Sequence, residues 1–299
     1  MQPRPTTLLR QLLRAKTFLH MPSVYDALTG RLVQSLGYEA AYVGGYVTGG
    51  SLAVTEPLLT MTEQVTLAGA IAQSVRIPVI ADAGAGFGEP LHAMRTVREF
   101  IRTGVAGIHI EDQLYPKRAH YHKYVVHGIP VEEFIDKIAY SVRQRDEIDP
   151  DFLIIARTDT CRALGLEEAS MRLNRAADAG ADMGLLFPRN PQEAADAPRK
   201  CRLPLVYVQS RGNRDGRPIF SRQELIDMGY VACIEAQVVL CSALFHHKKI
   251  LTELRATGQV SGMSNDDWVA ARQEVEDLID LTSYYEIEQA TVEAREQEK

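Results

Sequence analysis

Charged side chains follow three successive apolar runs of the chain, where they can serve a metal ion and an acidic substrate. Asp82 follows one run, Glu111 and Asp112 follow the next, and Arg157 and Asp159 stand at the end of the third. Carboxylates gathered at one place offer the hard oxygen ligands that Mg²⁺ takes, and an arginine beside them can hold a carboxylate in a bidentate fork. These residues predict metal-assisted chemistry on a small anionic carboxylate.

The alternative for each of these carboxylates is structural. An acidic residue after a strand more often caps a helix or carries a loop charge than binds a ligand. The occurrence of such residues at three successive strand ends favours the functional interpretation. The glycines between Asp82 and Gly88 allow close backbone approach to a ligand, but they alternate and lack the GxGxxG spacing of a dinucleotide site.

A basic, histidine-containing stretch, residues 117–124, directly follows the Glu111–Gln113 segment. It is too long for a minimal turn between a strand and a helix, so we interpret it as an active-site lid that carries Lys117, His120 and His122 over a bound anion. The two histidines form only an HxH pair, which is a weak metal signal. A solvated basic loop is the alternative.

Glycines also follow the apolar run that contains Tyr42. The backbone N–H groups of Gly44, Gly45 and Tyr46 can bind a carboxylate or enolate oxygen, which is the stabilisation that an enol-forming reaction needs. The alternative is that these glycines only make a tight turn.

Eight short apolar runs with helix-length intervals between most neighbours must position these groups. Their alternation with amphipathic stretches predicts a parallel sheet, and eight runs predict a (β/α)₈ TIM-type barrel. In such a barrel the catalytic groups lie beyond the C-terminal ends of the strands. The runs are Thr17–Met21, Ala40–Gly44, Ile77–Ala81, Gly107–Ile110, Phe152–Arg157, Met183–Phe187, Leu205–Val208 and Tyr230–Ile234.

Helices are expected between these runs and beyond them. Cap-like residues and glycines delimit stretches at Asp26–Leu36, Glu89–Thr103, Pro130–Arg145 and Leu166–Ala179. We expect residues 1–245 to form the catalytic barrel. In residues 246–299 the pattern predicts helices without strands, at Ser264–Leu281 and Tyr284–Glu298. We expect these helices either to pack on the barrel or to exchange with a neighbouring subunit.

Composition excludes several classes of protein. The 299 residues are 45% hydrophobic and 24% charged, which rules out disorder, a collagen and a disulfide scaffold. The net charge of −6 gives no electrostatic case for nucleic acid. No apolar run is long enough for a membrane span. The four cysteines lack zinc-like spacing, so we expect reduced and mostly buried thiols in a cytoplasmic protein.

The motifs taken together resemble the isocitrate lyase/phosphoenolpyruvate mutase superfamily. The layout is similar to that of its 2-methylisocitrate lyase and carboxyphosphonoenolpyruvate mutase members, and the resemblance covers most of the chain. It implies a barrel that depends on Mg²⁺, or Mn²⁺ in its place, and forms a pyruvate-like enolate. The motifs are Pro22–Ala27, Tyr42–Gly45, Asp82–Gly88, Ile110–Gln113, Lys117–Arg118, Ala156–Asp159 and Tyr284–Tyr285.

The resemblance also implies roles for single residues. Asp82 corresponds to the metal-bound carboxylate, and Glu56 and Glu111 to carboxylates of the metal shell. Arg157 corresponds to a substrate-carboxylate clamp, and the Gly44–Tyr46 backbone to the group near the enolate oxygen. The superfamily further implies a homotetramer in which the C-terminal helix is swapped between subunits.

Three departures from the superfamily pattern alter the predicted site. Gly84 stands where a second metal-shell Asp is usual, and Ala119 stands where the lyases carry a proton-transferring Cys. Arg189 stands where a Glu follows the Phe-Pro of the sixth strand, so we assign Arg189 to substrate binding. Without the thiol, Tyr42 or a lid histidine, His120 or His122, is expected to transfer the proton.

Three functions are compatible with these motifs and their departures. The first is a Mg²⁺-dependent lyase that cleaves a C–C bond of a small 2-hydroxy or 2-oxo carboxylate, with Lys117 and Arg157 among its catalytic groups. The second is an oxaloacetate decarboxylase or hydrolase, or an enzyme of phosphonate P–C chemistry. The third is a non-catalytic, ligand-binding barrel, which the losses at Gly84 and Ala119 favour.

Overall fold

The eight predicted runs form one parallel eight-stranded sheet in the computed structural model, which describes residues 3–16, 18–119 and 123–297. Its order is β1-β8-β7-β6-β5-β4-β3-β2. The strands are β1 Leu19–Pro22, β2 Ala41–Val43, β3 Val79–Asp82, β4 Gly107–Glu111, β5 Leu153–Thr158, β6 Met183–Leu186, β7 Leu205–Gln209 and β8 Ala232–Glu235. The first strand begins at Leu19, later than the predicted run Thr17–Met21, and Thr17 lies outside the described residues.

The sheet closes between its first and second strands. Ser23 and Tyr42 form a parallel bridge just beyond β1, and the N–H of Val24 donates to the carbonyl of Tyr42 at 2.9 Å. The other seven pairs of neighbouring strands are regularly hydrogen-bonded, so this short contact closes the sheet into a barrel. The predicted (β/α)₈ barrel is thus confirmed.

Strand register places the charged strand ends side by side. Asp82 at the end of β3 is the register partner of His109 in β4, and Glu111 at the end of β4 is the partner of Arg157 in β5. Because all strands are parallel, their C-terminal ends meet at one mouth of the barrel. The predicted convergence of these groups follows directly from this register.

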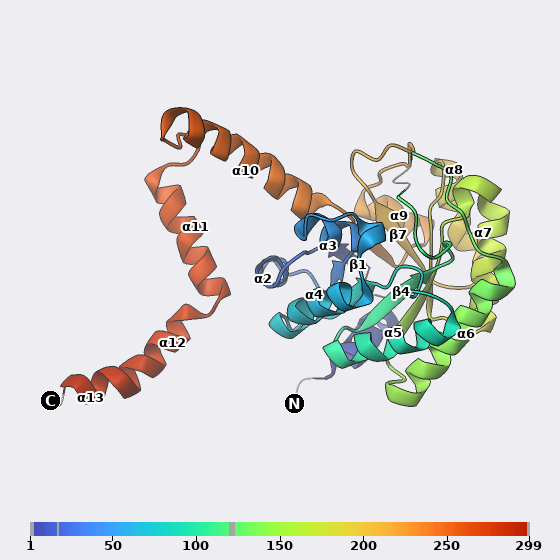
Figure 1. Ribbon diagram of the computed structural model, residues 1–299, viewed down its shortest axis with the longest axis horizontal. Helices are drawn as coiled ribbons and strands as arrows, with labels where there is room; N and C mark the ends of the chain where they lie inside the picture. Colours follow the sequence, from blue (N-terminus) through green and yellow to red (C-terminus); the bar gives the residue numbers. More distant parts are fainter. Residues whose placement is uncertain (1–2, 17, 120–122, 298–299) are drawn as a thin grey trace. The chain divides into compact units, whose positions relative to one another are not determined.

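Helices surround the barrel, and Figure 1 shows α4, α5, α6 and α7 following one another along its outer side. Several boundaries have clear local causes. A capping box of Asp26 and Thr29 begins α2, and Gly104 in the left-handed conformation ends α5. The helices up to β8 are α1 Pro5–Arg14, α2 Ala27–Ser35, α3 Gly45–Ser51, α4 Met61–Ser74, α5 Pro90–Thr103, α6 Val131–Ile148, α7 Cys161–Asp178, α8 Pro191–Lys200 and α9 Arg222–Met228, with a 3₁₀ turn η1 at Glu56–Leu58.

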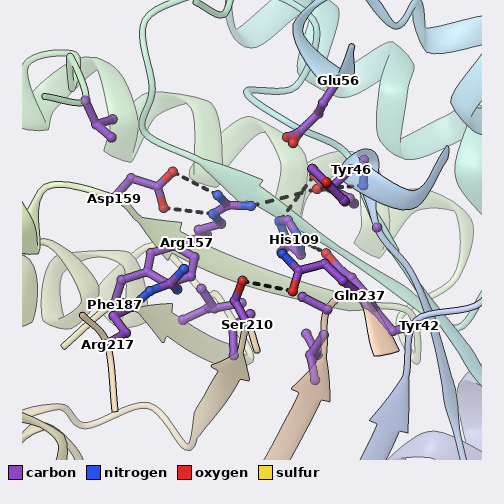
Figure 2. A pocket seen from close by; sticks show the side chains of 18 of the residues that line it. Tyr42, Tyr46, Glu56, His109, Arg157, Asp159, Phe187, Ser210, Arg217 and Gln237 are labelled. Carbon is purple, nitrogen blue, oxygen red and sulfur yellow. Dashed lines mark hydrogen bonds and ion pairs between the residues drawn. The ribbon is translucent and has the colours of Figure 1, made fainter. Parts of the chain in front are cut away.

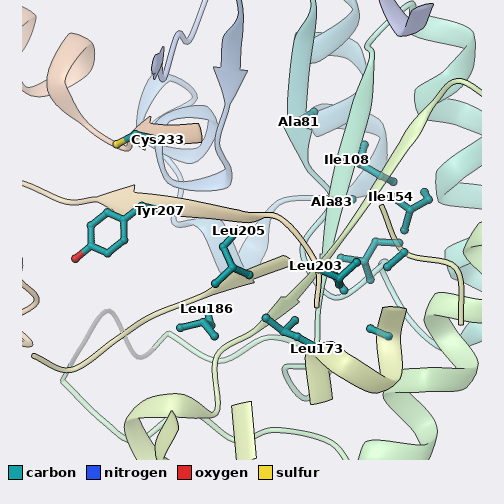
Figure 3. Close-up of a cluster of buried hydrophobic side chains, with 14 of the residues drawn as sticks. Ala81, Ala83, Ile108, Ile154, Leu173, Leu186, Leu203, Leu205, Tyr207 and Cys233 are labelled. Atoms are coloured by element: carbon teal, nitrogen blue, oxygen red, sulfur yellow. The ribbon is translucent and has the colours of Figure 1, made fainter. Parts of the chain in front are cut away.

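Two layers of apolar side chains hold the barrel together, because neighbouring residues of a strand point to opposite faces. Ile80 and Ile155 belong to the inner cluster. Ile108, Ile154 and Leu173 belong to the outer cluster between strands and helices, which Figure 3 shows. Burial of each such side chain stabilises the fold by about 1.5–3 kcal/mol. The core therefore provides a rigid support for the groups at the barrel mouth.

The chain divides into two compact units, Met1–Leu240 and Cys241–Lys299. Helix α10, Val238–Thr257, begins in the first unit and continues into the second. The second unit continues with α11 Asn265–Leu278, α12 Leu281–Glu288, a π-helical turn η2 at Gln289–Glu293 and α13 Ala294–Gln297. In the described part of the chain, no helix has the length and apolar character needed to cross a bilayer.

The four cysteines are free thiols, which agrees with the sequence-based expectation. Cys161, Cys201 and Cys233 are buried, and Cys241 is exposed. Burial raises the pKa of the Cys161 and Cys233 thiols to about 12, so both stay protonated at neutral pH. The three buried cysteines are therefore packing residues of the barrel.

Candidate active site

A cavity of about 140 Å³ lies at the mouth of the barrel where the charged strand ends converge. Figure 2 shows side chains from several strands and loops pointing into it. Its walls combine acidic, basic, aromatic and amide groups, as a site for a small polar ligand requires. It is lined by Tyr42, Gly44, Gly45, Tyr46, Glu56, Asp82, His109, Lys117, Val126, Arg157, Asp159, Arg162, Leu185, Phe187, Val208, Ser210, Asp215, Arg217, Ile234, Ala236 and Gln237.

The glycine segment after β2 forms the start of α3 against Asp82. Gly44 precedes the helix, and the N–H of Gly45 donates to Oδ2 of Asp82 at 3.0 Å. A Cβ on Gly45 would lie 2.8 Å from Cγ of Glu56 and 3.1 Å from Asp82, so only glycine permits this approach. In this structure the Gly45 amide therefore orients Asp82, and the role of the Gly44–Tyr46 backbone toward a ligand oxygen stays a prediction.

Lys117 lies among the carboxylates of the cavity. Its Nζ is 3.0 Å from Oε1 of Glu111 and pairs closely with Glu56. Burial disfavours the ammonium, but the charges of Glu111 and Glu56 outweigh this effect and raise the pKa of Lys117. Lys117 is therefore a permanent cation in this structure, and it acts on charge balance rather than as a base.

Arg157 connects the carboxylates with the opposite wall. Its Nε and Nη2 donate to the two carboxylate oxygens of Asp159 at 2.8 and 2.9 Å, and Nη1 lies 3.1 Å from Oε2 of Glu111. Its guanidinium also lies over the ring of Phe187 at 4.9 Å. The predicted fork toward a substrate carboxylate is thus occupied by Asp159, because Asp159 follows at the end of the same strand.

Tyr42 and His109 form a hydrogen-bonded pair at the base of the cavity. The Tyr42 hydroxyl contacts Nε2 of His109, and the rings stack with centroids 5.7 Å apart. Burial lowers the pKa of His109 to about 4, and burial and the charge of Asp82 raise the pKa of Tyr42 well above its usual value. At neutral pH the pair is a neutral imidazole beside a protonated phenol.

Most of the chain is similar to known enzymes. The phosphoenolpyruvate phosphomutase family model matches residues 9–254. The chain belongs to the PEP mutase/isocitrate lyase superfamily. It is 34% identical to the 2,3-dimethylmalate lyase of Eubacterium barkeri, with 94% of this chain and 96% of that protein covered. It is 33% identical to the chloroplastic carboxyvinyl-carboxyphosphonate phosphorylmutase of Arabidopsis thaliana, with 95% and 84% covered.

A solved superfamily structure shares the architecture as well. Oxaloacetate acetylhydrolase, in complex with 3,3-difluorooxalacetate, superposes with a TM-score of 0.87 at 30% identity and covers 96% of this chain and 97% of its own. The superfamily resemblance inferred from the motifs is thereby confirmed, and so is the barrel fold that it implies.

The superfamily implies a divalent cation, and the residues of this chain fit one. Glu111 is fully buried, and its two carboxylate oxygens lie 3.0 Å from Nζ of Lys117 and 3.1 Å from Nη1 of Arg157. Burial raises its pKa to about 7. Asp82, Glu56 and Asp159 add three further carboxylates, and the cations beside these four carboxylates are Lys117 and Arg157. Oxygen donors with excess negative charge suit Mg²⁺, which also keeps several waters.

The departure at Gly84 leaves room beside Asp82. Gly84 has a positive φ of 51° and donates its N–H to Oδ1 of Asp82 at 2.7 Å, while a Cβ at this position would meet no atom within 4 Å. A small cavity of about 30 Å³, large enough for water, adjoins Gly84, Asp82 and Glu56. The structure therefore has space for a water molecule beside Gly84, where the sequence resemblance implies a carboxylate.

The structure does not bring Arg189, which the sequence assigns to substrate binding, to the cavity. The Arg189 side chain is 47% exposed, pairs with Glu193 one helical turn later, and does not line the cavity. The chain turns outward after Phe187, so the ring of Phe187 enters the site and the next charged residue does not. His120 and His122 lie outside the described residues, so their predicted roles are untested.

Several cavity residues were not predicted. His109 could have been found from strand alternation, because it lies two residues before Glu111 and therefore points to the same side of β4. The sequence indicates Asp159 as one of the carboxylates after the strands, but not that it accepts two hydrogen bonds from Arg157. Ser210, Arg217 and Gln237 follow β7 and β8 in loops whose course the sequence does not reveal.

Proposed function

We propose that this chain is a divalent-cation-dependent lyase that cleaves a carbon–carbon bond of a small 2-hydroxy or 2-oxo carboxylate through a pyruvate-like enolate. The observation that carries the proposal is one cluster of charged groups: Asp82, Lys117 and Arg157 line the cavity, and the fully buried Glu111 pairs with Lys117 and Arg157. The similarity to 2,3-dimethylmalate lyase, over nearly the full length of both chains, supports a C–C lyase.

We call the part of the cavity around Asp82, Glu56 and Lys117 the cation end, and its residues have different roles. Asp82 would hold Mg²⁺ directly, with Glu56 and Glu111 beside it, and the bound ion supplies Lewis-acid stabilisation of developing negative charge on oxygen. Lys117 and Arg157 bring positive charge to an anionic substrate and hold the neighbouring carboxylates in place. The close packing of Gly45 against Asp82 and Glu56 keeps this arrangement compact.

Proton transfer is assigned to Tyr42. Ala119 has no acidic or basic group, so the lid position that carries a thiol in the related lyases has no proton to transfer. Tyr42 lines the cavity, keeps its proton at neutral pH, and is oriented by its hydrogen bond with the neutral imidazole of His109. We infer that the Tyr42 hydroxyl delivers the proton to the enolate carbon.

Oxaloacetate decarboxylation or hydrolysis is the second candidate, with P–C bond chemistry as a variant. The replacement of the lid thiol by Ala119 favours a decarboxylation, because that reaction needs a proton donor for the enolate but no base for a hydroxyl group. The solved oxaloacetate acetylhydrolase supports hydrolysis. The non-catalytic alternative has less support, because the named relatives are enzymes.

Binding of oxalate, which mimics the enolate, tests the proposal. We expect calorimetry to show oxalate binding that requires Mg²⁺, because the carboxylates need a cation before they can accept an anion. Product analysis then separates the reactions: a 2-oxo acid with a second carboxylic acid indicates a lyase acting on a 2-hydroxy acid, pyruvate with CO₂ a decarboxylase, oxalate with acetate a hydrolase, and phosphoryl transfer P–C chemistry. No oxalate binding at millimolar concentration would contradict an enolate-forming site.

We also propose a homotetramer in which the C-terminal helices are exchanged between subunits. Leu244, Phe245 and Leu251 of α10 are each at least 60% exposed in the single chain, as expected for side chains that a second copy covers. Sedimentation equilibrium should give four times the chain mass of 33.3 kDa. A monomeric mass at micromolar concentration would contradict the exchange.

A further inference from the structure

A buried glutamine, Gln64, lies beside the cation end and has no role in the reaction proposed above. It belongs to the first turn of α4 and is 1% exposed, although glutamine is a residue type that mostly lies at protein surfaces. Together with Asp82, Glu56 and Gly84, it lines the small cavity of about 30 Å³ that adjoins the main site. Helix α4 therefore brings a neutral amide to the carboxylates that we assign to the cation.

One end of the Gln64 amide is hydrogen-bonded and the other is not. Its Nε2 donates to the carbonyl of Val43, the last residue of β2, at 3.4 Å. A carbonyl oxygen only accepts, so the nitrogen must face Val43 and Oε1 is the remaining end. Within the described residues this buried Oε1 accepts no hydrogen bond. A buried polar atom without a partner costs stability, so it indicates a place for a ligand or a water molecule.

The small cavity has the size and polarity of a site for one water molecule. Its volume of about 30 Å³ exceeds the roughly 10–15 Å³ that one water needs. The carboxylates of Asp82 and Glu56 on its wall accept hydrogen bonds, and so does Oε1 of Gln64. Lys117 also lines this cavity, but its ammonium pairs with Glu56 and Glu111. A water molecule that donates to such acceptors directs its own oxygen toward a cation, and Mg²⁺ keeps several waters.

Gly84 leaves this space open because it has no side chain. A Cβ at this position would meet no atom within 4 Å. The φ of Gly84 is 51°, in the left-handed region that aspartate and asparagine adopt more readily than other residues with a side chain. An acidic side chain is therefore compatible with position 84, and the space beside it is accessible to either a carboxylate or a water molecule.

We propose that Gln64 is a positioning residue of the cation site: its Oε1 accepts a hydrogen bond from a water molecule of the cation's hydration shell, in the space beside Gly84. The inference rests on the proposed function and adds to it a residue of α4. Because the acceptor is neutral, the site carries one negative charge fewer than it would with a carboxylate at position 84. The alternative role for Gln64 is to connect α4 with β2 through Val43 and nothing more.

Binding of Mn²⁺ in the absence of substrate tests this role without any knowledge of the reaction. Electron paramagnetic resonance of the free ion gives the affinity for Mn²⁺, and competition gives the affinity for Mg²⁺. We expect Gln64→Leu, which has a similar volume but no acceptor, to weaken binding about 10- to 100-fold, as the loss of a hydrogen-bond partner behind a metal site does.

Gln64→Glu separates the two roles of the side chain. Its carboxylate keeps an acceptor and adds a negative charge, so we expect this variant to bind Mn²⁺ at least as tightly as the wild type. The contact with Val43 needs a donor, which an ionised glutamate and a leucine both lack. A role limited to that contact therefore predicts that both variants lose stability and that neither changes the affinity for the ion.

Gly84→Asp tests whether the two positions share one water site. The added carboxylate should tighten Mn²⁺ binding and make Gln64 dispensable, so Gln64→Leu in this background should change the affinity by less than about threefold. Gln73→Leu is the matched control, because it removes an amide from an exposed position of the same helix and should leave Mn²⁺ binding unchanged. Thermal unfolding of each variant verifies the fold.

The outcomes distinguish this inference from the proposed function. If the wild-type chain binds Mn²⁺ and Gln64→Leu binds it equally well, or if Gln64→Leu and Gln64→Glu weaken binding alike, Gln64 does not position the cation's water and the proposed function still stands. An undiminished effect of Gln64→Leu in the Gly84→Asp background would overturn the placement of the water beside Gly84. If the wild-type chain binds neither Mn²⁺ nor Mg²⁺, the proposed function fails and the inference fails with it.

Discussion

Replacement of Asp82 by alanine should lower turnover at least about a thousandfold and remove Mg²⁺-dependent oxalate binding. Asp82 ends β3 inside the barrel mouth, and two backbone N–H groups, those of Gly45 and Gly84, hold its carboxylate. These bonds orient the oxygens toward the cavity before any ligand arrives. Asp82 is the residue that we propose binds the metal directly. Loss of its carboxylate should therefore abolish both turnover and Mg²⁺-dependent oxalate binding.

Two variants control for effects on folding. Asp82→Asn keeps the shape of the side chain and removes its charge, so it should lose metal-dependent binding while thermal unfolding stays close to that of the wild type. Asp136→Ala removes a carboxylate from an exposed position of α6 and should leave turnover unchanged. An Asp82→Ala protein that retains full turnover without added divalent cation would show that the metal role is wrong.

Replacement of Tyr42 by phenylalanine should lower kcat about 100- to 10,000-fold, because general acid–base groups contribute on this scale. Oxalate binding should change by less than about threefold, since oxalate needs no proton. Burial and the charge of Asp82 hold the pKa of Tyr42 high, so the wild-type hydroxyl is a proton donor throughout the neutral range. Steady-state kinetics together with oxalate calorimetry measures both quantities.

Tyr230→Phe is the matched control for the loss of a buried hydroxyl. The Tyr230 hydroxyl donates to the carbonyl of Ala194 at 3.0 Å, and Tyr230 does not line the cavity. We expect this variant to lose about 1 kcal/mol of unfolding free energy and no activity. If Tyr42→Phe keeps more than a tenth of the wild-type kcat, another group transfers the proton, and the lid histidines become the next residues to test.

The barrel could be predicted because its signals are local. Each strand is a short apolar run, and each intervening helix has its own caps and apolar face, as Asp26 and Gly104 illustrate. Parallel strands then bring their C-terminal ends to one mouth, so Asp82, Glu111 and Arg157 could be placed together without knowledge of the packing.

The partners of these groups could not be predicted in the same way. The sequence identified Arg157 as a clamp for substrate, but the structure shows its fork holding Asp159, because the two side chains point into the same small volume. The neutral state of His109 likewise depends on complete burial beside Tyr42. Burial is a property of the packed barrel and has no signature in a single strand.

The sequence by itself determined the fold class, the mouth of the barrel and the carboxylates that face it, because strand periodicity and parallel order are properties of short segments. Only the tertiary structure decided which loop arginine reaches the cavity. Arg189 follows a turn that directs it to solvent and Glu193, whereas Arg217 is carried inward by a loop that Asn213 fixes. Loop paths depend on contacts between residues distant in the chain, and those contacts exist only in the folded barrel.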